Sequence, residues 1–425
     1  MASGAEGHLS FMNNLGNQIM EGERATLPPL AAASGSHEAP GFVWLDSSLE
    51  ERGGLSLLSY EPDLILEGNV SEWHLLEREL ERRRREAPDL DIPDGAAIGY
   101  FRFDGSYRFG FYDRIHLHAS DGWVGPAPSC VGKPFENTPS EPLPAELDFR
   151  SEMTRKDYIR MVRRAQEYVK AGDIYQVCLA HRFTADFVGD PWSLYLALRE
   201  ASPAPHAAYL RLGDETVLSS SPECFLKMSG RRISTRPIKG TRPRRRDPEE
   251  DEHQAFELRT SPKEIAELVM ITDLERNDLG SVCEFGSVSA TELLHLERYA
   301  QVFHLVSTVE GELRKEVSQV AALAACFPGG SISGAPKKRA LEIIKELEPS
   351  PRGLFTGAIG YFGYNGESQF NIAIRTLVIR NGRAIFHVGA GITADSVPEK
   401  EWEETLHKAA GILQAARIGK REKPK

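Results

Sequence analysis

The chain has 425 residues, 41% of them hydrophobic and 27% charged, which is typical of a globular protein with enough apolar material for a large core. Its net charge of −11 argues against general nucleic-acid binding, because phosphate contacts require a basic face. No apolar run approaches the roughly 18 residues of a membrane-spanning helix, and no signal-peptide pattern opens the chain, so we expect a cytoplasmic protein without a membrane segment.

Composition divides the chain into four segments. Residues 1–40 are rich in Gly, Ala, Ser and Pro and are predicted to form a flexible leader. Residues 41–145 contain short strand-like runs and an Arg/Glu-rich helix near 72–85, and they end in a proline-rich linker. Residues 150–418 alternate helices with β-rich segments and are predicted to carry the chemistry, and residues 419–425 form a tail.

A five-residue echo links the two large segments. Ala97–Phe101 reads AIGYF, and the same letters recur at Ala358–Phe362. Chance can produce such a repeat. A duplicated hairpin is the alternative, and it favours one intertwined architecture over two independent domains.

A basic segment follows two strand-like runs. Glu223 ends the first run in Ser-Pro-Glu, and Lys239 then lies between Arg236 and Arg242. Neighbouring positive charges disfavour an ammonium ion, so Lys239 is a candidate nucleophile with a lowered pKa. The alternative is a solvated basic loop balanced by the acidic run at 249–252.

Two predicted helices carry paired carboxylates. The first begins with Ser261 as N-cap, runs to about Leu274, and presents Glu264 and Glu267 on one face. The second begins near Ser396, and its stripe consists of Glu401, Glu404 and Lys408. Such faces suit a Mg²⁺ ion that keeps several waters, although capping and solvent exposure also explain them.

A glycine-rich stretch, residues 329–334, precedes a helix predicted over 336–347. Free backbone N–H groups there can bind a carboxylate or phosphate, or the stretch can be a simple tight turn. The stretch does not match a nucleotide-binding P-loop, because Ala335 and Pro336 replace the Lys-Ser/Thr pair.

Eight motifs, in order and spacing, resemble the chorismate-binding family. They are GDIYQVCLAHRF (from Gly172), SPECFL (Ser221), RPIKGTRPR (Arg236), SPKEIAELVMITDLERNDLG (Ser261), VFHLVSTVEG (Val302), FPGGSISGAPKKRALEIIKELEP (Phe327), FNIAIRT (Phe370) and GAGITADSVPEKEWEETLHK (Gly389). The resemblance covers about residues 150–416, and more weakly 42–103. It implies an α+β fold of two orthogonally packed, mostly antiparallel sheets sandwiched between helices, with chorismate in the cleft between them.

The resemblance also assigns roles. Glu267 and Glu404 match direct ligands of a Mg²⁺ ion that holds the ring carboxylate of chorismate, with Glu264 and Glu401 reaching the ion directly or through water. His304 matches a histidine near that carboxylate, or is a core histidine. Positions that match the substrate-binding set are Gln176, Thr241, Ser331, Phe355, Arg375, Gly389, Ala390, Gly391 and Lys408. Phe355 departs from the tyrosine or tryptophan of many relatives, so any hydroxyl contact there is lost.

Two positions discriminate among family members. Relatives that add water have a general-base lysine where this chain has Gln176, so the resemblance points to ammonia as the nucleophile. Anthranilate synthases have alanine where aminodeoxychorismate synthases have the lysine found here as Lys239. In the implied mechanism Lys239 attacks C2 of the ring, Glu223 acts as general acid to expel the C4 hydroxyl, and ammonia then adds at C4.

None of the five cysteines lies in the nucleophile turn of a glutamine amidotransferase, so we expect a separate amidotransferase subunit to supply ammonia. The product, 4-amino-4-deoxychorismate, would need a further enzyme to become the folate precursor 4-aminobenzoate. Two alternatives stay open. One is anthranilate synthase component I, and the other is a non-catalytic anion-binding regulatory protein using the basic cluster at 236–246.

Overall fold

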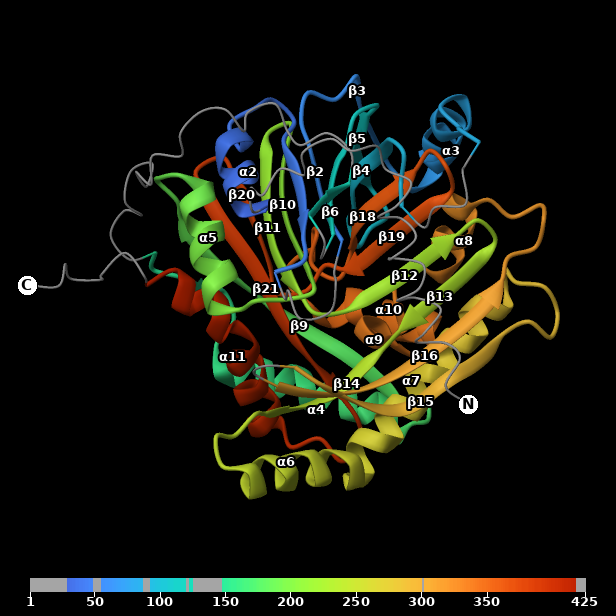
Figure 1. Cartoon of the computed structure of the whole chain (residues 1–425). Helices are drawn as coiled ribbons and strands as arrows, with labels where there is room; N and C mark the ends of the chain where they lie inside the picture. The colour runs from blue at the N-terminus through green and yellow to red at the C-terminus, as the bar shows by residue number, and fades with distance from the viewer. Residues whose placement is uncertain are drawn as a thin grey trace, which may run out of the picture.

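The computed structural model describes residues 29–48, 55–86, 92–119, 122–124, 147–299 and 302–417. They form two antiparallel β-sheets that pack face to face, with helices on both outer faces (Figure 1). This confirms the predicted α+β class. Within the described ranges, no helix is both long and apolar enough to cross a bilayer. The predicted linker and the tail at 419–425 lie outside these ranges.

The first sheet contains, in spatial order, β17 (Gly334–Ala335), β9 (Gln176–Asp186), β21 (Arg383–Ile392), β20 (Thr376–Arg380), β11 (Glu215–Ser221), β10 (His206–Leu212), β1 (Val43–Asp46), β2 (Ser56–Ser59), β6 (His116–Ala119) and β7 (Gly122–Val124), with β8 (Arg150–Ser151) beside β9. The second contains β14 (Ile238–Pro243), β16 (Val302–Glu312), β13 (Arg232–Arg236), β12 (Cys224–Ser229), β19 (Glu367–Ile372), β18 (Ala358–Gly363), β4 (Ala96–Phe101), β5 (Tyr107–Tyr112) and β3 (Leu64–Gly68), with β15 (Ser289–Arg298) beside β16. Both sheets combine strands from the N-terminal and C-terminal regions.

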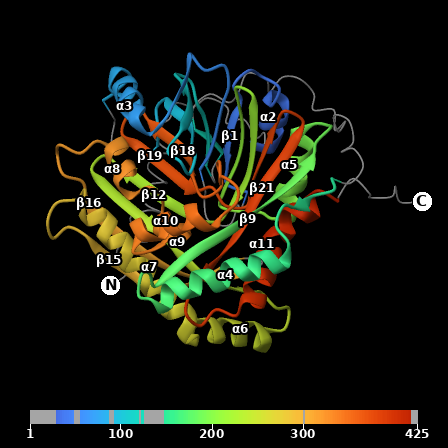
Figure 2. The ribbon, with the colours of Figure 1, turned by 180° about the vertical axis from the view of Figure 1, so that it is seen from behind.

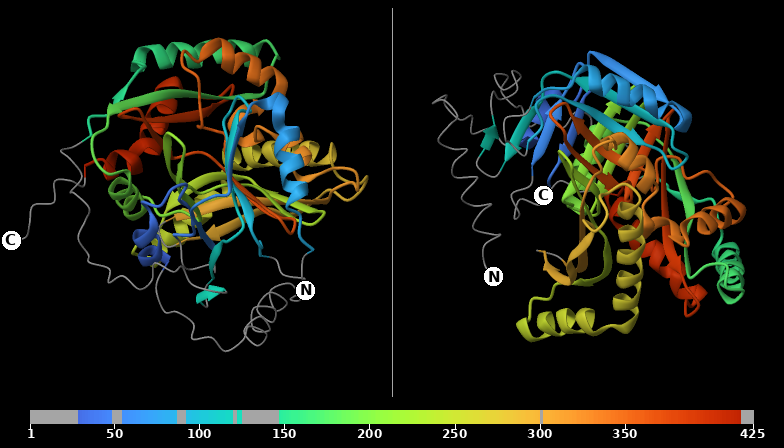
Figure 3. Two further views of the ribbon diagram at one scale, coloured as in Figure 1. Left: turned by 90° about the horizontal axis from the view of Figure 1, so that it is seen from above. Right: turned by 90° about the vertical axis from the view of Figure 1, so that its right-hand side faces the viewer.

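Helices cover the outer faces. Those on the first sheet are α4 (Arg155–Lys170), α5 (Pro191–Ala201), α10 (Lys337–Leu347) and α11 (Pro398–Ala415), as seen from behind in Figure 2. Those on the second are α3 (Trp73–Arg82), α6 (Pro248–Thr260), α7 (Pro262–Gly280) and α8 (Gln319–Cys326). In the right-hand view of Figure 3, the yellow helices α6 and α7 meet at one corner of the molecule. Short helical turns are α2 (Pro29–Ser36), η2 (Val70–Glu72) and α9 (Gly330–Ser333).

The repeated AIGYF sequences form two neighbouring strands. Strands β4 and β18 are antiparallel neighbours, and Gly99 of one pairs directly with Gly360 of the other. Each strand is buried on both faces, because alternate residues face the helices and the other sheet. This pairing joins the N-terminal and C-terminal regions in one sheet, which fits the intertwined architecture favoured by the repeat.

Close backbone approach between β4 and its other neighbour, β5, gives a stability prediction. A Cβ on Gly99 would lie 2.0 Å from the carbonyl oxygen of Arg108 on β5, so the strands would have to move apart. We expect Gly99→Ala to lower the free energy of unfolding by about 1–3 kcal/mol. Gly280→Ala is the matched control, because a Cβ there meets open space, and it should change stability by less than about 0.5 kcal/mol. Urea titration of both variants checks the prediction, and equal effects would contradict it.

The N-terminal segment differs from the expected leader. Residues 29–36 form α2, whose Ala32 and Ala33 are buried. Ala33 packs in the core cluster that holds Trp192 of α5, and His37 stacks on that ring at 4.9 Å. Residues 29–40 therefore belong to the folded part of the chain. The sequence did not indicate this, because each alanine is only weakly hydrophobic and is buried here by a surface formed from other segments. Residues 1–28 lie outside the described ranges.

Candidate active site

Lys239 and Glu223 lie near enough to influence each other electrostatically. Lys239 lies on β14, and its ammonium donates a hydrogen bond of 3.4 Å to the backbone oxygen of Ser331 in the short helix α9. Glu223 lies in the turn between β11 and β12, as its position after a strand-like run predicted, and is only 6% exposed. The sequence-predicted nucleophile and acid are thus neighbours in space.

Burial raises the pKa of Glu223, against the opposing influence of the Lys239 ammonium and of the Ser331 hydroxyl. Glu223 Oε1 and Ser331 Oγ are both buried. Among the described residues, neither atom has a hydrogen-bond partner at acceptable distance and angle. Buried polar atoms normally find partners, so these two atoms are available for a bound molecule.

The two carboxylate helices converge on the same lysine. Burial raises the pKa of Glu267 on α7, and the charges of Glu264 and Glu404 raise it further, while Lys239 opposes them. Burial would raise the pKa of Glu404 on α11, but Lys408, whose ammonium lies 2.7 Å away, and Lys239 hold it below its usual range. Glu267 and Glu404 therefore face Lys239 from different helices.

The other two predicted carboxylates, Glu264 and Glu401, have partners other than Lys239. Ser261 caps α7 as predicted, since its hydroxyl accepts from the Glu264 amide at 3.4 Å. Glu264 Oε1 also lies 3.7 Å from the guanidinium of Arg242. Glu401 is 3% exposed, and burial raises its pKa despite the nearby Ser396 hydroxyl.

Two carboxylates from different helices fit a Mg²⁺ ion, which takes one or two direct carboxylate ligands and keeps several waters. Glu267 and Glu404 repel each other electrostatically, so a cation between them would be stabilised. Within the described ranges, however, no group of three or more His, Cys, Asp or Glu side chains is arranged to enclose a metal ion by itself. The residues present thus fit an ion that keeps several of its water ligands.

The expectation that arginines crowd Lys239 is wrong. Arg236 pairs with Glu297 on β15 at 2.7 Å, and Arg244 pairs with Asp251 on α6 at 2.9 Å. Lys239 is instead surrounded by the carboxylates Glu223, Glu267 and Glu404. Arg244 is thus neutralised by the acidic run at 249–252, as the alternative reading of the sequence expected, and Arg236 by a carboxylate from β15.

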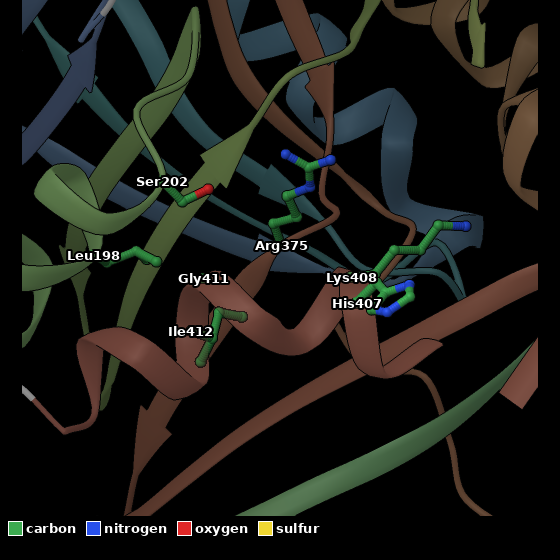
Figure 4. Close-up of a pocket in the computed structure, with 7 residues that line it drawn as sticks. All are labelled: Leu198, Ser202, Arg375, His407, Lys408, Gly411 and Ile412. Atoms are coloured by element: carbon green, nitrogen blue, oxygen red, sulfur yellow. The ribbon is translucent and has the colours of Figure 1, made fainter. Parts of the chain in front are cut away.

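A small pocket adjoins the site on the side of α11. Its volume is about 130 Å³, and its walls come from the end of α5, α11 and the segment before β20 (Figure 4). Arg375 and Lys408 both line it, with His407 and Ser202. In the described part of the chain, the Arg375 guanidinium has neither an ion pair nor a hydrogen bond. A partly buried cation of this kind favours an anionic ligand.

His304 and Thr241 form a polar pair beside the site. Thr241 Oγ1 and His304 Nδ1 are 3.0 Å apart, on the neighbouring strands β14 and β16. Burial, reinforced by the charge of Arg375, lowers the pKa of His304 to about 4. The imidazole is therefore neutral at pH 7, so it can orient a ligand but does not supply positive charge.

The remaining predicted positions lie on β9, β21 and the segment before β18. Gln176 packs its carboxamide against Gly391, where a Cβ would lie 2.3 Å from Nε2, and its buried Oε1 has no hydrogen bond in the described chain. Lys408 donates to the Gly389 oxygen at 3.0 Å. Ala390 points into the core under α4 and α10, so only its backbone could contact a ligand. Phe355 is buried and stacks on His387 at 5.4 Å.

The glycine-rich stretch is not an open anion-binding loop. Its last part, Gly334–Ala335, is β17 and pairs with Gln176 and Val177 of β9, and α10 begins only at Lys337. Hydrogen bonds to β9 therefore occupy backbone groups that the sequence predicted to be free for an anion.

Sequence reasoning missed three charged residues of the site. Lys263 lies 3.8 Å from Glu267, and its charge also acts on Glu404. Arg352 and Glu348 form a buried ion pair directly behind the site. A charged pair after the helix at 337–347 was visible in the sequence, but nothing in its spacing marked it as buried.

Comparison with known proteins identifies the family. A family model described as chorismate binding enzyme matches residues 116–414. Anthranilate synthase component 1 of Thermus thermophilus is 47% identical over 285 residues, covering 67% of this chain and 62% of that protein. Aminodeoxychorismate synthase component 1 of Escherichia coli is 47% identical over 277 residues, covering 65% and 61%. The matched part thus spans about three-fifths of these curated relatives.

Solved structures agree on the fold. The crystal structure of anthranilate synthase component I from Streptococcus pneumoniae superimposes with a TM-score of 0.76 at 28% identity, covering 91% of this chain and 97% of that one. The menaquinone-specific isochorismate synthase MenF of Escherichia coli has the same fold, with a TM-score of 0.73 at 17% identity and 92% coverage of both chains. With the family model matching well over half of its length, the chain belongs to the chorismate-binding enzyme family.

Proposed function

We propose that this chain is the synthase component of aminodeoxychorismate synthase, which converts chorismate and ammonia to 4-amino-4-deoxychorismate. The observation that carries the proposal is Lys239, whose amine lies among Glu223, Glu267 and Glu404 and beside the turn of Ser331. A lysine so placed in a chorismate-binding enzyme is suited to nucleophilic attack on the ring.

The chemistry proceeds in two displacements with shifting double bonds. Lys239 first gives its ammonium proton to a neighbouring carboxylate. The resulting amine forms a bond to C2, the ring electrons move toward C4, and the C4–oxygen bond breaks as Glu223 gives its proton to the departing hydroxyl, which leaves as water. Ammonia then bonds to C4, the electrons return, and the bond from Lys239 to C2 breaks. Covalent catalysis divides one difficult substitution into two easier steps, and the raised pKa of Glu223 keeps the proton available.

The charged groups around the site suit the two carboxylates of chorismate. Arg375 and Lys408 are placed to bind one of them, since both line the same pocket. We further propose that Glu267 and Glu404 hold Mg²⁺, with Glu264 and Glu401 acting directly or through water. When bound, the ion supplies positive charge that holds the ring carboxylate in place.

Removal of the proposed metal ligands gives a testable result. Glu267→Gln and Glu404→Gln should each reduce chorismate turnover at 1 mM Mg²⁺ by about 100-fold, because a held cation contributes several kcal/mol of charge stabilisation. Added Mg²⁺ should partly restore the rate. Glu403→Gln is the control, since Glu403 is exposed on the same helix. Turnover that both substitutions leave unchanged, or turnover in excess chelator, would contradict the proposed metal role of Glu267 and Glu404. A wild-type chain that consumes no chorismate with Mg²⁺ and ammonium would support a non-catalytic protein.

Ammonia is proposed to come from a separate glutamine amidotransferase. No Gly-x-Cys-x-Gly turn occurs in the sequence, and the relatives named component 1 carry that number as parts of multi-component enzymes. Ammonium alone should therefore support the reaction of the isolated chain at high concentration, whereas glutamine should not.

The nearest rival is anthranilate synthase component I, the name of several relatives with similar identity. Incubation with chorismate, Mg²⁺ and ammonium separates the two proposals. We expect chorismate to be consumed without formation of fluorescent anthranilate, and 4-aminobenzoate to form only after a lyase for 4-amino-4-deoxychorismate is added. Immediate anthranilate fluorescence would favour the rival.

A further inference from the structure

The guanidinium of Arg352, which lies behind the site, donates five hydrogen bonds. It lies in the segment between α10 and β18, and its side chain is 1% exposed. An arginine has five N–H donors, and here five acceptors lie within 3.1 Å. These acceptors are Glu348 Oε2 (2.9 Å), Glu348 Oε1 (2.7 Å), Ile332 O (3.0 Å), Thr356 Oγ1 (3.1 Å) and Cys178 O (2.7 Å).

Each acceptor adjoins a residue of the proposed site. Ile332 follows Ser331 in α9, Thr356 follows Phe355, and Cys178 lies two residues after Gln176 on β9. Glu348 extends the same connection, because its Oε1 also accepts the amide of Ala180 on β9 at 2.8 Å. One ion pair thus joins three chain segments that are otherwise distant in sequence.

Two further observations place Arg352 as a support for the substrate-facing side chains. Its guanidinium lies 5.8 Å from the ring centre of Phe355 and 4.6 Å from that of Phe103, within cation–π range. Thr356 has a φ of 62°, a left-handed conformation that costs a β-branched residue energy unless its surroundings hold it. The hydrogen bond from Arg352 to the Thr356 hydroxyl helps to hold it.

The turn that carries Ser331 is therefore tethered on both sides. Lys239 donates to the Ser331 oxygen, and Arg352 donates to the oxygen of the next residue, Ile332. A shift of this turn would change the distance between Lys239 and the ring it attacks. We propose that Arg352, held by Glu348, is a positioning residue that fixes the turn of Ser331, Phe355 and β9 relative to Lys239. The role in catalysis rests on the proposed function, but the role in fixing the turn does not.

The test compares Arg352→Lys with Arg108→Lys. Arg108 is a matched control, because its side chain is 8% exposed and pairs with Glu67 and Asp214 at the far end of β5. Lysine has only three donors, so Arg352→Lys loses at least two of the five buried hydrogen bonds. We expect it to lower kcat for chorismate consumption about 100-fold, with KM changed much less, because small misplacement of reacting groups costs that much. Arg108→Lys should lose similar thermal stability and keep its kcat.

Two additional measurements keep the result unambiguous. Guanidinium added to Arg352→Ala should recover part of kcat, whereas a merely destabilised protein should not respond. Hydrogen exchange of amides 329–334 should be faster in Arg352→Lys than in the wild type or Arg108→Lys, whatever reaction the enzyme performs. If Arg352→Lys does not fold, Glu348→Gln removes the charge pair with a smaller change and should show the same split.

The outcomes separate two failures. A wild-type protein that does not consume chorismate would overturn the proposed function, and the exchange data would still decide whether Arg352 fixes the turn. A wild-type protein that consumes chorismate, with equal kcat in Arg352→Lys, would overturn the positioning role. Unchanged exchange at 329–334 would also overturn it.

Discussion

Lys239→Ala is expected to abolish a covalent substrate adduct and to reduce formation of 4-amino-4-deoxychorismate at least about 1,000-fold, as losses of other catalytic nucleophiles do. The side chain is half-buried on β14, and its amine is held beside the turn of Ser331 and near Glu223. Alanine leaves the strand pairing with β16 intact, because that pairing uses only the backbone. The loss should therefore lie in kcat and not in stability.

Intact-protein mass spectrometry after rapid acid quenching checks the adduct. The wild type incubated with chorismate and Mg²⁺ but no ammonia should gain the mass of chorismate less one water, because the C4 hydroxyl has left. Lys227→Ala, which removes an exposed lysine of β12 in the same sheet, should keep the adduct. An adduct that survives in Lys239→Ala would remove this residue from the mechanism.

Glu223→Gln is expected to cost about 100-fold to 10,000-fold in kcat, the range for loss of a general acid. Glutamine matches the shape of the carboxyl group but has no proton to give to the departing hydroxyl. Glu215→Gln is a matched control, because Glu215 is a buried carboxylate at the opposite end of β11, where Arg102 and Arg380 bind it. That variant should lose stability and keep its pH–rate profile.

The pH dependence of kcat tests whether Glu223 acts in its protonated form. Burial raises the pKa of this carboxyl, so it keeps its proton above the pH at which an exposed glutamate is ionised. As a general acid it is active only below its raised pKa, so the rate should fall as the pH rises through that value. Glu223→Gln should lack this limb. A limb that remains in the variant would assign the titration to another group.

Local sequence signals predicted much of the site. The Ser-Pro-x-Glu start and the three-residue spacing of Glu264 and Glu267 place both carboxylates on one face of α7, and the structure puts them there. Glu223 after a strand and the stripe on α11 follow from equally short-range rules. Local periodicity fixes which side of a helix a residue faces, so these predictions needed no long-range information.

The prediction that failed depended on a partner from far along the chain. The arginines beside Lys239 were expected to repel it, yet Glu297 on β15 pairs with Arg236, while Asp251, in the acidic run at 249–252 that the sequence offered as an alternative, pairs with Arg244. Glu348 and Arg352 are four residues apart and visible as a charged pair, but the backbone acceptors at 178 and 332 come from other segments. Charge pattern along a sequence does not reveal that such a pair is buried.

The position of the new nitrogen tests the central claim most directly. The chain should be incubated with chorismate, Mg²⁺ and ¹⁵N-ammonium, and the product examined by NMR before any lyase is added. Attack by Lys239 at C2 followed by ammonia at C4 predicts ¹⁵N bonded to C4 of a ring that retains its enolpyruvyl group. Nitrogen bonded to C2, or an aromatic product formed at once, would contradict the account.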